Sequence, residues 1–196
     1  ADLETFFDQP IPFLPSTSVV TDESFGNVSP QAAVAYHLQP NRTIYGSFSQ
    51  AFKAGGFNPF SLPGSEAYDE ENTWNLEGGW KSSWAGGKVT ANASAFFIDW
   101  DDIQLNLPIP GAPGQFYIDN VGAATSRGLE VEVSARPHQQ VSVFGSLGFT
   151  RARFKDGSQS NGVDVSDKKL PNTPAQTAMI GLEVARPVNQ RWSLVG

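Results

Sequence analysis

The chain has 196 residues and a formal net charge of −7; 17% of its residues are charged and 12% are aromatic. The acidic balance argues against a nucleic-acid partner, and the absence of cysteine excludes both a disulfide framework and a thiolate metal site. Because no stretch approaches about 18 consecutive apolar residues, a transmembrane helix is also excluded, whereas transmembrane strands, which are only half apolar, are not.

Residues 1–30 show no regular pattern, and we expect them to form a loop or irregular segment that precedes the first strand. Their start, "ADLETFFDQPIPF", has neither the basic region nor the apolar region of a signal peptide. We therefore expect that a signal has been removed or that the sequence begins inside a longer chain.

From residue 31 onward, apolar and polar residues alternate with a period of two, which is typical of strands and not of helices. In "TWNLEGGWK", Trp74 and Trp80 lie on one face of the predicted strand, and Glu77 and Lys81 lie on the other. Eight strands are predicted, at residues 31–38, 43–50, 72–82, 87–100, 124–136, 140–152, 176–186 and 191–196. The pattern predicts an all-β, antiparallel fold.

Short and long connections alternate between these strands. The short connections carry Pro, Gly or Asn, the residues that form tight turns: "QPNR" at 39–42, "WAGG" at 84–87, "PHQ" at 137–139 and "PVNQ" at 187–190. The long connections each exceed twenty residues and span 51–71, 101–123 and 153–175. Soluble domains rarely carry three such loops, whereas outer-membrane barrels have short periplasmic turns and long extracellular loops. The alternation therefore favours a transmembrane β-barrel.

The side-chain faces of the predicted strands agree with a barrel. In "GLEVEVSA", Leu129 and Val131 oppose Glu130 and Glu132. Two carboxylates in one strand suit a hydrated lumen better than a packed core, because burying an unpaired charge is costly. Amphipathic rings favour membrane–water boundaries. The candidates for such aromatic girdles are Trp74, Trp80, Trp84 and Trp100.

Two alternatives remain open from the pattern alone. The first is a soluble β-sandwich binding module, for instance one that binds carbohydrate, with Trp74 and Trp80 in a core or on a ligand platform. The second is a complete eight-stranded outer-membrane barrel, in which residues 191–196 would pair with 31–38. A strand of six residues is, however, too short to span a membrane.

Several motifs, in order along the chain, resemble the C-terminal part of the β-barrel of TonB-dependent outer-membrane receptors, of the kind that import ferric siderophores. They are "YGSFSQAFKAGGFN" (45–58), "YDEENTWNLEGGWKSSW" (68–84), "ANASAFFIDWDDIQL" (91–105), "YIDNVGAATSRGLEVEVSARP" (117–137), "SVFGSLGFTRARF" (142–154) and "LPNTP" (170–174). Barrels of this family have about 22 strands around a plug, and eight are predicted here. We therefore expect residues 31–196 to be a partial barrel, residues 1–30 to be extracellular, and the plug domain to be absent.

The resemblance implies a role in active uptake across the bacterial outer membrane. The whole receptor would capture a scarce ligand with its outer loops, and TonB would supply energy through the N-terminal region that is missing here. A ferric siderophore is the ligand most commonly associated with the family; haem, cobalamin and oligosaccharides remain open. Outer-membrane lipid would be a further partner, and neither a cofactor nor chemistry on the substrate is expected.

The resemblance also suggests which residues carry the function. Gly55 and Gly56 would let the first loop adopt backbone conformations closed to other residues. The candidates for facing a planar, anionic iron chelate are Lys53, Phe57, Phe60 and Tyr117, with simple folding of the loop as the alternative. The candidates for facing the lumen and the plug are Glu77, Lys81, Glu130, Glu132 and Glu183, with a hydrated wall as the alternative.

No catalytic or metal-binding set is visible in the sequence. His37 and His138 adjoin different turns and have no paired acidic or cysteine ligand motif. The sequence contains no G-x-S-x-G, H-E-x-x-H or phosphate-binding glycine motif, and its loop carboxylates lack the spacing of a calcium loop. Enzyme activity and a resident metal are not expected.

Overall fold

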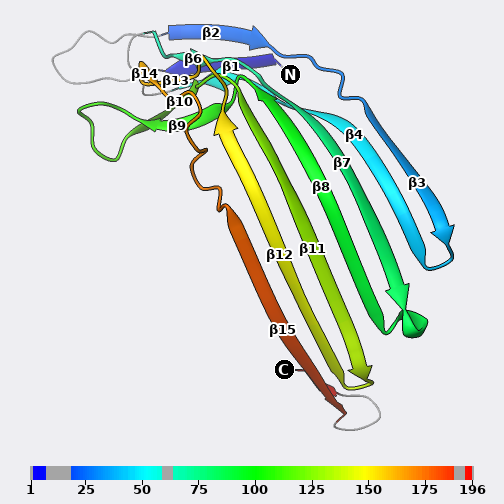
Figure 1. Ribbon diagram of the computed structural model, residues 1–196. Helices are drawn as coiled ribbons and strands as arrows, with labels where there is room; N and C mark the ends of the chain where they lie inside the picture. Colours follow the sequence, from blue (N-terminus) through cyan, green and yellow to red (C-terminus); the bar gives the residue numbers. More distant parts are fainter. Residues whose placement is uncertain (1, 8–18, 59–63, 188–192, 196) are drawn as a thin grey trace.

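The computed structural model describes residues 2–7, 19–58, 64–187 and 193–195. Within them, eight strands form one antiparallel sheet in which each strand pairs with its neighbours in the chain (Figure 1). These strands are β3 (Gln31–Gln39), β4 (Arg42–Lys53), β7 (Glu71–Trp84), β8 (Val89–Asp101), β11 (Ala124–His138), β12 (Val141–Phe154), β15 (Gln176–Pro187) and β16 (Ser193–Val195). The predicted all-β antiparallel fold is confirmed, and no helix in the described residues is long and apolar enough to cross a membrane.

The short turns lie together at one end of the sheet and the long loops at the other (Figure 1). The backbone angles of the turn between β7 and β8 account for the glycines in "WAGG". Ala85, Gly86 and Gly87 there form a short 3-10 turn, η1, with φ angles of 52°, 66° and 88°. Glycine adopts such left-handed conformations without steric cost. The predicted turn at 187–190 lies almost wholly outside the described residues.

The long loops contain strands of their own, which the period-two pattern did not predict. The strands β5 (Gly56–Phe57) and β6 (Ala67–Tyr68) pair, as do β9 (Gln104–Pro108) with β10 (Phe116–Asn120) and β13 (Gln159–Ser160) with β14 (Val163–Asp164). Before the main sheet, β1 (Asp2–Phe7) pairs with β2 (Val19–Ser24), so residues 1–30 are not wholly irregular. Strands this short contain too few alternations to stand out as a period of two.

The strand register places apolar side chains on one face of the sheet and polar ones on the other. One row of cross-strand neighbours across the apolar face runs through Ile44, Trp80, Ala93, Val131, Leu147 and Ala178. Many large side chains on this apolar face are exposed; Leu76 is 57% exposed and Leu182 is 62% exposed. A face this apolar and this open requires a partner or a non-aqueous solvent.

Both alternative folds disagree with this sheet. A β-sandwich would bury one face against a second sheet, but in the residues that the structure describes the strands outside the main sheet form only two-stranded pairs. A closed eight-stranded barrel would join β3 to β16, but in the described residues these strands are the two edges of the sheet. The arrangement is that of an open segment of a larger barrel.

The buried apolar core of the described residues lies at the loop end. Its members come from the loops after β8 and β12 and from the adjoining ends of β11 and β12: Ile103, Leu107, Tyr117, Val121, Ala124, Ala152, Phe154 and Leu170. Val121 is 1% exposed and Ala124 is fully buried. Among the residues that the structure describes, the chain therefore builds its own core only where its loops meet.

Candidate functional site

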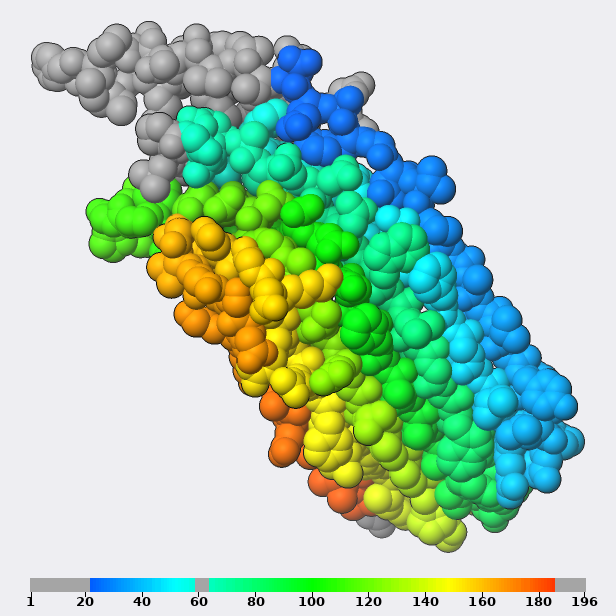
Figure 2. All heavy atoms as spheres, turned by 45° about the horizontal axis from the view of Figure 1, so that its top comes forward, coloured from blue at the N-terminus to red at the C-terminus, as the bar shows by residue number. Residues whose placement is uncertain are grey.

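The loops at one end of the sheet are joined into a single structure, which we call the loop platform. It comprises the described residues 54–58, 64–70, 102–123 and 155–175. Figures 1 and 2 both show the hairpin between β9 and β10 next to the segment that contains β13 and β14. Hydrogen bonds between the three loops fix this arrangement, as the following contacts show.

The side-chain amide of Asn58 links the first loop to the second. Its Oδ1 accepts a hydrogen bond from the backbone N–H of Ile118 at 2.8 Å, and its Nδ2 donates to the Ile118 carbonyl at 2.8 Å. The same Nδ2 also donates to the Ser65 carbonyl at 2.9 Å. Asn58 is only 8% exposed, so these bonds are shielded from water and costly to break. The Asn58 side chain thus pairs with the backbone of Ile118 as a residue of a neighbouring strand would.

Two further amide side chains make equivalent links. Asn120 Oδ1 accepts from the backbone N–H of Asp69 at 2.7 Å, and its Nδ2 donates to the carbonyls of Asp69 and Asp102. Gln104 Nε2 donates to the carbonyls of Ala54 and Asp69 at 3.0 and 2.9 Å. The first loop is therefore held against the second at three separate points.

A carboxylate at the start of β7 anchors this assembly to the sheet. Glu71 Oε1 accepts from Trp100 Nε1 at 3.0 Å, and Glu71 Oε2 accepts from the backbone N–H of Gln104 at 2.8 Å. The register pairs Trp100 with Thr73 and Ala124, on the polar face of the sheet. Trp100 therefore does not share the apolar face with the other girdle candidates. Its indole instead contacts Glu71 where the sheet meets the loop platform.

The third loop joins through Ser158, Tyr117 and Lys155. Ser158 Oγ donates to the Ala123 carbonyl at 2.9 Å, and the Tyr117 hydroxyl donates to Asn161 Oδ1 at 2.6 Å. Lys155 forms ion pairs with Asp99 and Asp101. Partial burial alone would lower the pKa of Lys155, but the hydrogen bonds and negative charges of the two aspartates outweigh it and raise the pKa above its ordinary value.

The four ligand-facing candidates have different environments. Lys53 is exposed at the end of β4, opposite Glu71. Phe57 is half-buried in β5, and Phe60 lies outside the described residues. Tyr117 is only 5% exposed, and burial, followed by the charge of Asp119, raises its pKa. Tyr117 is therefore a core residue, which corrects the prediction that it faces a ligand.

The glycine pair of the first loop has a different explanation from the predicted one. Neither Gly55 nor Gly56 has a φ in the left-handed region. A Cβ on Gly55 would lie 2.4 Å from the Tyr68 carbonyl oxygen and 2.6 Å from the Phe25 ring. A Cβ on Gly56 would lie 2.6 Å from the Tyr68 hydroxyl. Close approach of neighbouring chain, and not unusual backbone angles, requires glycine here.

The structure reveals surface residues that the sequence reasoning missed. Phe116, at the start of β10, is 60% exposed, and Val163 in β14 is 58% exposed. Phe116 precedes the buried Tyr117, so period-two alternation inside "FYIDN" could have predicted that the two rings face opposite ways. The bridging amides of Asn58 and Gln104 had no such signal, because only tertiary contacts distinguish them from ordinary polar loop residues.

The polar face carries a cluster that we call the polar wall: Tyr45, Glu77, Lys81, Asn92, Glu130 and Glu132. These side chains line one hollow. The Tyr45 hydroxyl donates to Glu77 Oε1 at 2.5 Å, and Lys81 Nζ lies 5.0 Å from the centroid of the Tyr45 ring. With three carboxylates and one ammonium, the polar wall is net negative. Glu183 shares this face but stands apart, opposite Ser142 in β12.

The remaining girdle candidates share the apolar face at two levels. Trp74, towards the loop end, stacks on Phe48 with ring centroids 5.1 Å apart. Trp80 and Trp84, towards the turn end, make an edge contact at 5.8 Å. Two separate aromatic levels on an apolar face are the arrangement expected for girdles at two interfaces.

The histidines and carboxylates show no metal-binding arrangement in the part of the chain that the structure describes. The His37 ring bonds Thr43 Oγ1 at 2.9 Å, and His138 Nδ1 accepts from the backbone N–H of Gln140 at 3.3 Å. Both histidines therefore stabilise turns at the end opposite the loop platform.

Comparison with known proteins identifies a family and a curated relative. Residues 6–196 match the family model described as TonB dependent receptor-like, beta-barrel. A "Ferric-pyoverdine 358 receptor" from Pseudomonas putida is 28% identical over 136 residues, which cover 68% of this chain and 16% of that protein. The chain therefore spans about a sixth of the length of this curated relative.

Solved structures give matching folds. The ferric yersiniabactin uptake receptor FyuA from Yersinia pestis has a TM-score of 0.72 at 20% identity, with 92% of this chain and 26% of that chain covered. The ferripyoverdine receptor of the outer membrane of Pseudomonas aeruginosa has a TM-score of 0.61 at 18% identity, with 87% and 22% covered. At these identities the likeness establishes the fold alone.

Proposed function

The chain belongs to the TonB-dependent receptor β-barrel family, and from that premise we propose that it forms wall and ligand-facing loops of a receptor that imports a ferric siderophore. Proteins of this family are transporters of the bacterial outer membrane and not enzymes. The apolar face of the sheet then contacts lipid, which accounts for its exposed Leu, Val and Ile side chains.

The observation that carries the proposal is the loop platform. Its loops are held together by buried amides and a shared apolar core, so they present a defined surface at one end of the barrel wall. A rigid loop surface binds a ligand with less loss of conformational entropy than mobile loops do. The exposed ring of Phe116 and the exposed ammonium of Lys53 are suited to an aromatic, anionic iron chelate.

The choice of ligand class is supported by the names of the relatives. The curated relative is a ferric-pyoverdine receptor, and the two solved structures are receptors for ferric yersiniabactin and ferripyoverdine. All three names refer to iron complexes. Uptake through this chain would use energy delivered by TonB, as is typical of the family, and would leave the ligand chemically unchanged.

The polar wall supports a second part of the proposal. Glu77, Glu130 and Glu132 outnumber Lys81 there, so this surface favours a basic partner inside the lumen. In the whole receptor that partner would be the plug, held by hydrogen bonds that break when the plug moves. The single Glu183 is a further candidate for such a contact.

Binding of iron complexes to the receptor that contains this chain tests the proposal. Ferric pyoverdine and ferric yersiniabactin are titrated into the purified receptor, and quenching of tryptophan fluorescence is measured. We expect Lys53→Ala to weaken binding of at least one complex about tenfold, the size of one charge-assisted contact. Phe116→Ala should weaken it by a similar factor.

The matched control is Lys88→Ala, which removes an exposed lysine at the turn end of the sheet. This variant should bind as the unchanged receptor does. Binding of haem or cobalamin with no binding of either iron complex would overturn the siderophore proposal. Equal affinities in the Lys53, Phe116 and Lys88 variants would overturn the assignment of the binding rim.

A further inference from the structure

Two arginines lie directly opposite each other where the apolar face meets the loop platform. The register pairs Arg127 of β11 with Arg151 of β12, and both are exposed. The next row of the same face is Leu129 opposite Phe149, and Val131 opposite Leu147 follows. The two guanidinium groups therefore stand at the boundary between the charged loop end and the apolar surface.

The surrounding charges make this pair unusual. One row nearer the loops, Arg153 forms an ion pair with Asp167, and beyond it Lys155 pairs with Asp99 and Asp101. In the described part of the chain, the side chains of Arg127 and Arg151 have no hydrogen-bond or ion-pair partner. Like charges directly opposite each other in a sheet are destabilising. An anion between the two groups would relieve this repulsion.

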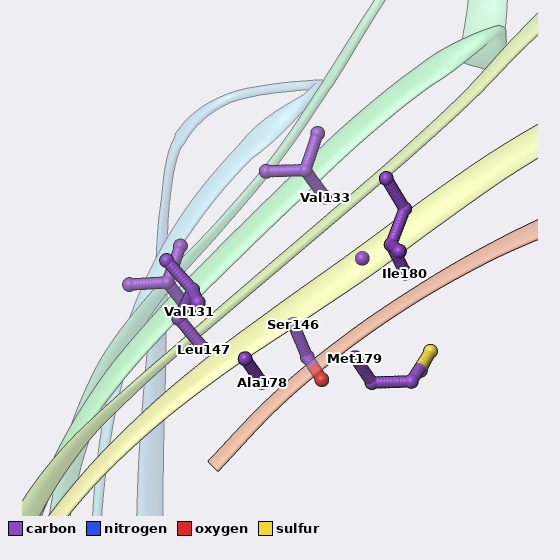
Figure 3. A pocket seen from close by; sticks show the side chains of 8 residues that line it. Val131, Val133, Ser146, Leu147, Ala178, Met179 and Ile180 are labelled. Atoms are coloured by element: carbon purple, nitrogen blue, oxygen red, sulfur yellow. The ribbon is translucent and has the colours of Figure 1, made fainter. Parts of the chain in front are cut away.

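The surface beside the pair is apolar and hollowed. Both arginines line a depression together with Leu129, Phe149 and Ala175. Further along the same face, Val131, Leu147 and Ile180 line a second depression (Figure 3). A ligand for this surface must therefore combine an anionic head at the boundary with apolar chains below it.

We propose that Arg127 and Arg151 bind the phosphate of a phosphorylated lipid in the outer leaflet, whose acyl chain lies along the depressions of the apolar face. Paired guanidinium forks match the geometry of a phosphate group, and the lipid-facing position brings such a group within reach. The proposal rests on the outer-membrane location of the family and is independent of which ligand the receptor imports.

Lipid binding to the purified receptor in a non-ionic detergent, followed by native mass spectrometry, tests this. The probe is dioleoylphosphatidic acid; dioleoylglycerol presents the chains alone, and inorganic phosphate presents the head alone. We expect phosphatidic acid to remain bound where dioleoylglycerol does not. We expect the double variant R127Q/R151Q to weaken phosphatidic acid binding at least about tenfold, since two charge-assisted contacts are lost.

Two further variants separate charge, geometry and position. The variant R127K/R151K keeps both charges but loses the planar forks, so its affinity should fall between those of the unchanged receptor and of R127Q/R151Q. The control R136Q changes an exposed arginine at the opposite end of β11, where Arg136 Nε donates to Ser142 Oγ at 3.4 Å. That variant should bind phosphatidic acid normally. Arg127 and Arg151 are exposed, so their substitution removes no packed core atoms.

Several results would overturn the proposal. The first is unchanged affinity in R127Q/R151Q, and the second is an equal loss in R136Q. The third is equal retention of dioleoylglycerol and phosphatidic acid, which would assign binding to the apolar face alone. The fourth is full competition by inorganic phosphate at the same affinity as the lipid, which would show a simple anion site.

Discussion

The loop platform and the eight-stranded main sheet, which we call the strand wall or simply the wall, are stabilised in opposite ways. In the loop platform, Leu107, Val121 and Leu170 are less than 10% exposed, and buried side-chain amides join segments far apart in the sequence. In the wall, Leu182 is 62% exposed and Ile180 is 85% exposed. The platform therefore carries its own core, whereas the wall relies on backbone ladders and on whatever covers its apolar face.

The contrast implies that the stability of each region depends on a different solvent. Burial of apolar surface within the chain stabilises the loop platform in water. The wall instead presents its apolar side chains outward, which is stable only against hydrocarbon. A change of lipid or detergent should consequently affect the wall more than the loop platform, and a core substitution should do the reverse.

The largest expected effect is a loss of stability of the loop platform when its buried core is cut back. Leu107→Ala removes a buried side chain that is 6% exposed. We expect it to lower the free energy of local opening of the loop platform by about 2–5 kcal/mol, as for other buried leucines. Hydrogen exchange of the Val121 backbone amide, which donates to the Ile103 carbonyl at 2.9 Å, measures that opening in the receptor.

The matched control for this substitution is Leu182→Ala in the wall. Because Leu182 lies far from the loop end and faces outward, exchange of the Val121 amide should change by less than about 0.5 kcal/mol. An equal effect of the two substitutions on this amide would show that the wall and the loop platform open as one unit. The comparison between the two regions would then fail.

A smaller effect is expected from a single bridging amide. Asn58→Ala leaves the N–H and carbonyl of Ile118 and the carbonyl of Ser65 without their partner. We expect the contact between the first and second loops to weaken by about 1–3 kcal/mol, the cost of unsatisfied buried groups. Protease cleavage within the first loop should become faster. Asn106→Ala, at an exposed asparagine of β9, should leave cleavage unchanged.

The wall could be predicted from sequence, whereas the loop platform could not. Period-two alternation specifies a strand and its faces locally, so the positions of Glu77, Lys81 and Glu130 on one face followed directly. The burial of Tyr117 and the position of Trp100 depend on contacts between separate loops. Asn58 and Ile118, for example, are 60 residues apart. Nothing local in the sequence records such a contact, so aromatic loop residues were assigned to surfaces.

The smallest effect concerns the ion pairs of Lys155 at the edge of the loop platform. The pKa of Lys155 is raised because its contacts with Asp99 and Asp101 outweigh burial, which alone would lower it. A raised lysine pKa contributes stability that is fully present below the unfolded pKa of about 10.4 and is lost as pH rises through the higher folded pKa. The contribution of Lys155 to platform stability should therefore be constant near neutral pH and should be lost in strongly alkaline solution.

The magnitude of this alkaline effect is limited by exposure. The Lys155 side chain is 33% exposed and that of Asp101 is 53% exposed, so solvent screens the pairs and their contribution should stay below about 1 kcal/mol. Exchange of the Val121 amide, corrected for the intrinsic rate at each pH, measures it in the receptor and in Lys155→Gln. The substitution should remove the alkaline decline and lower the neutral-pH stability by the same small contribution, because the ion pairs are fully formed there. An alkaline decline of the same size in Lys155→Gln would instead assign the pH dependence to other groups, and the ion pairs would then contribute nothing measurable to the platform.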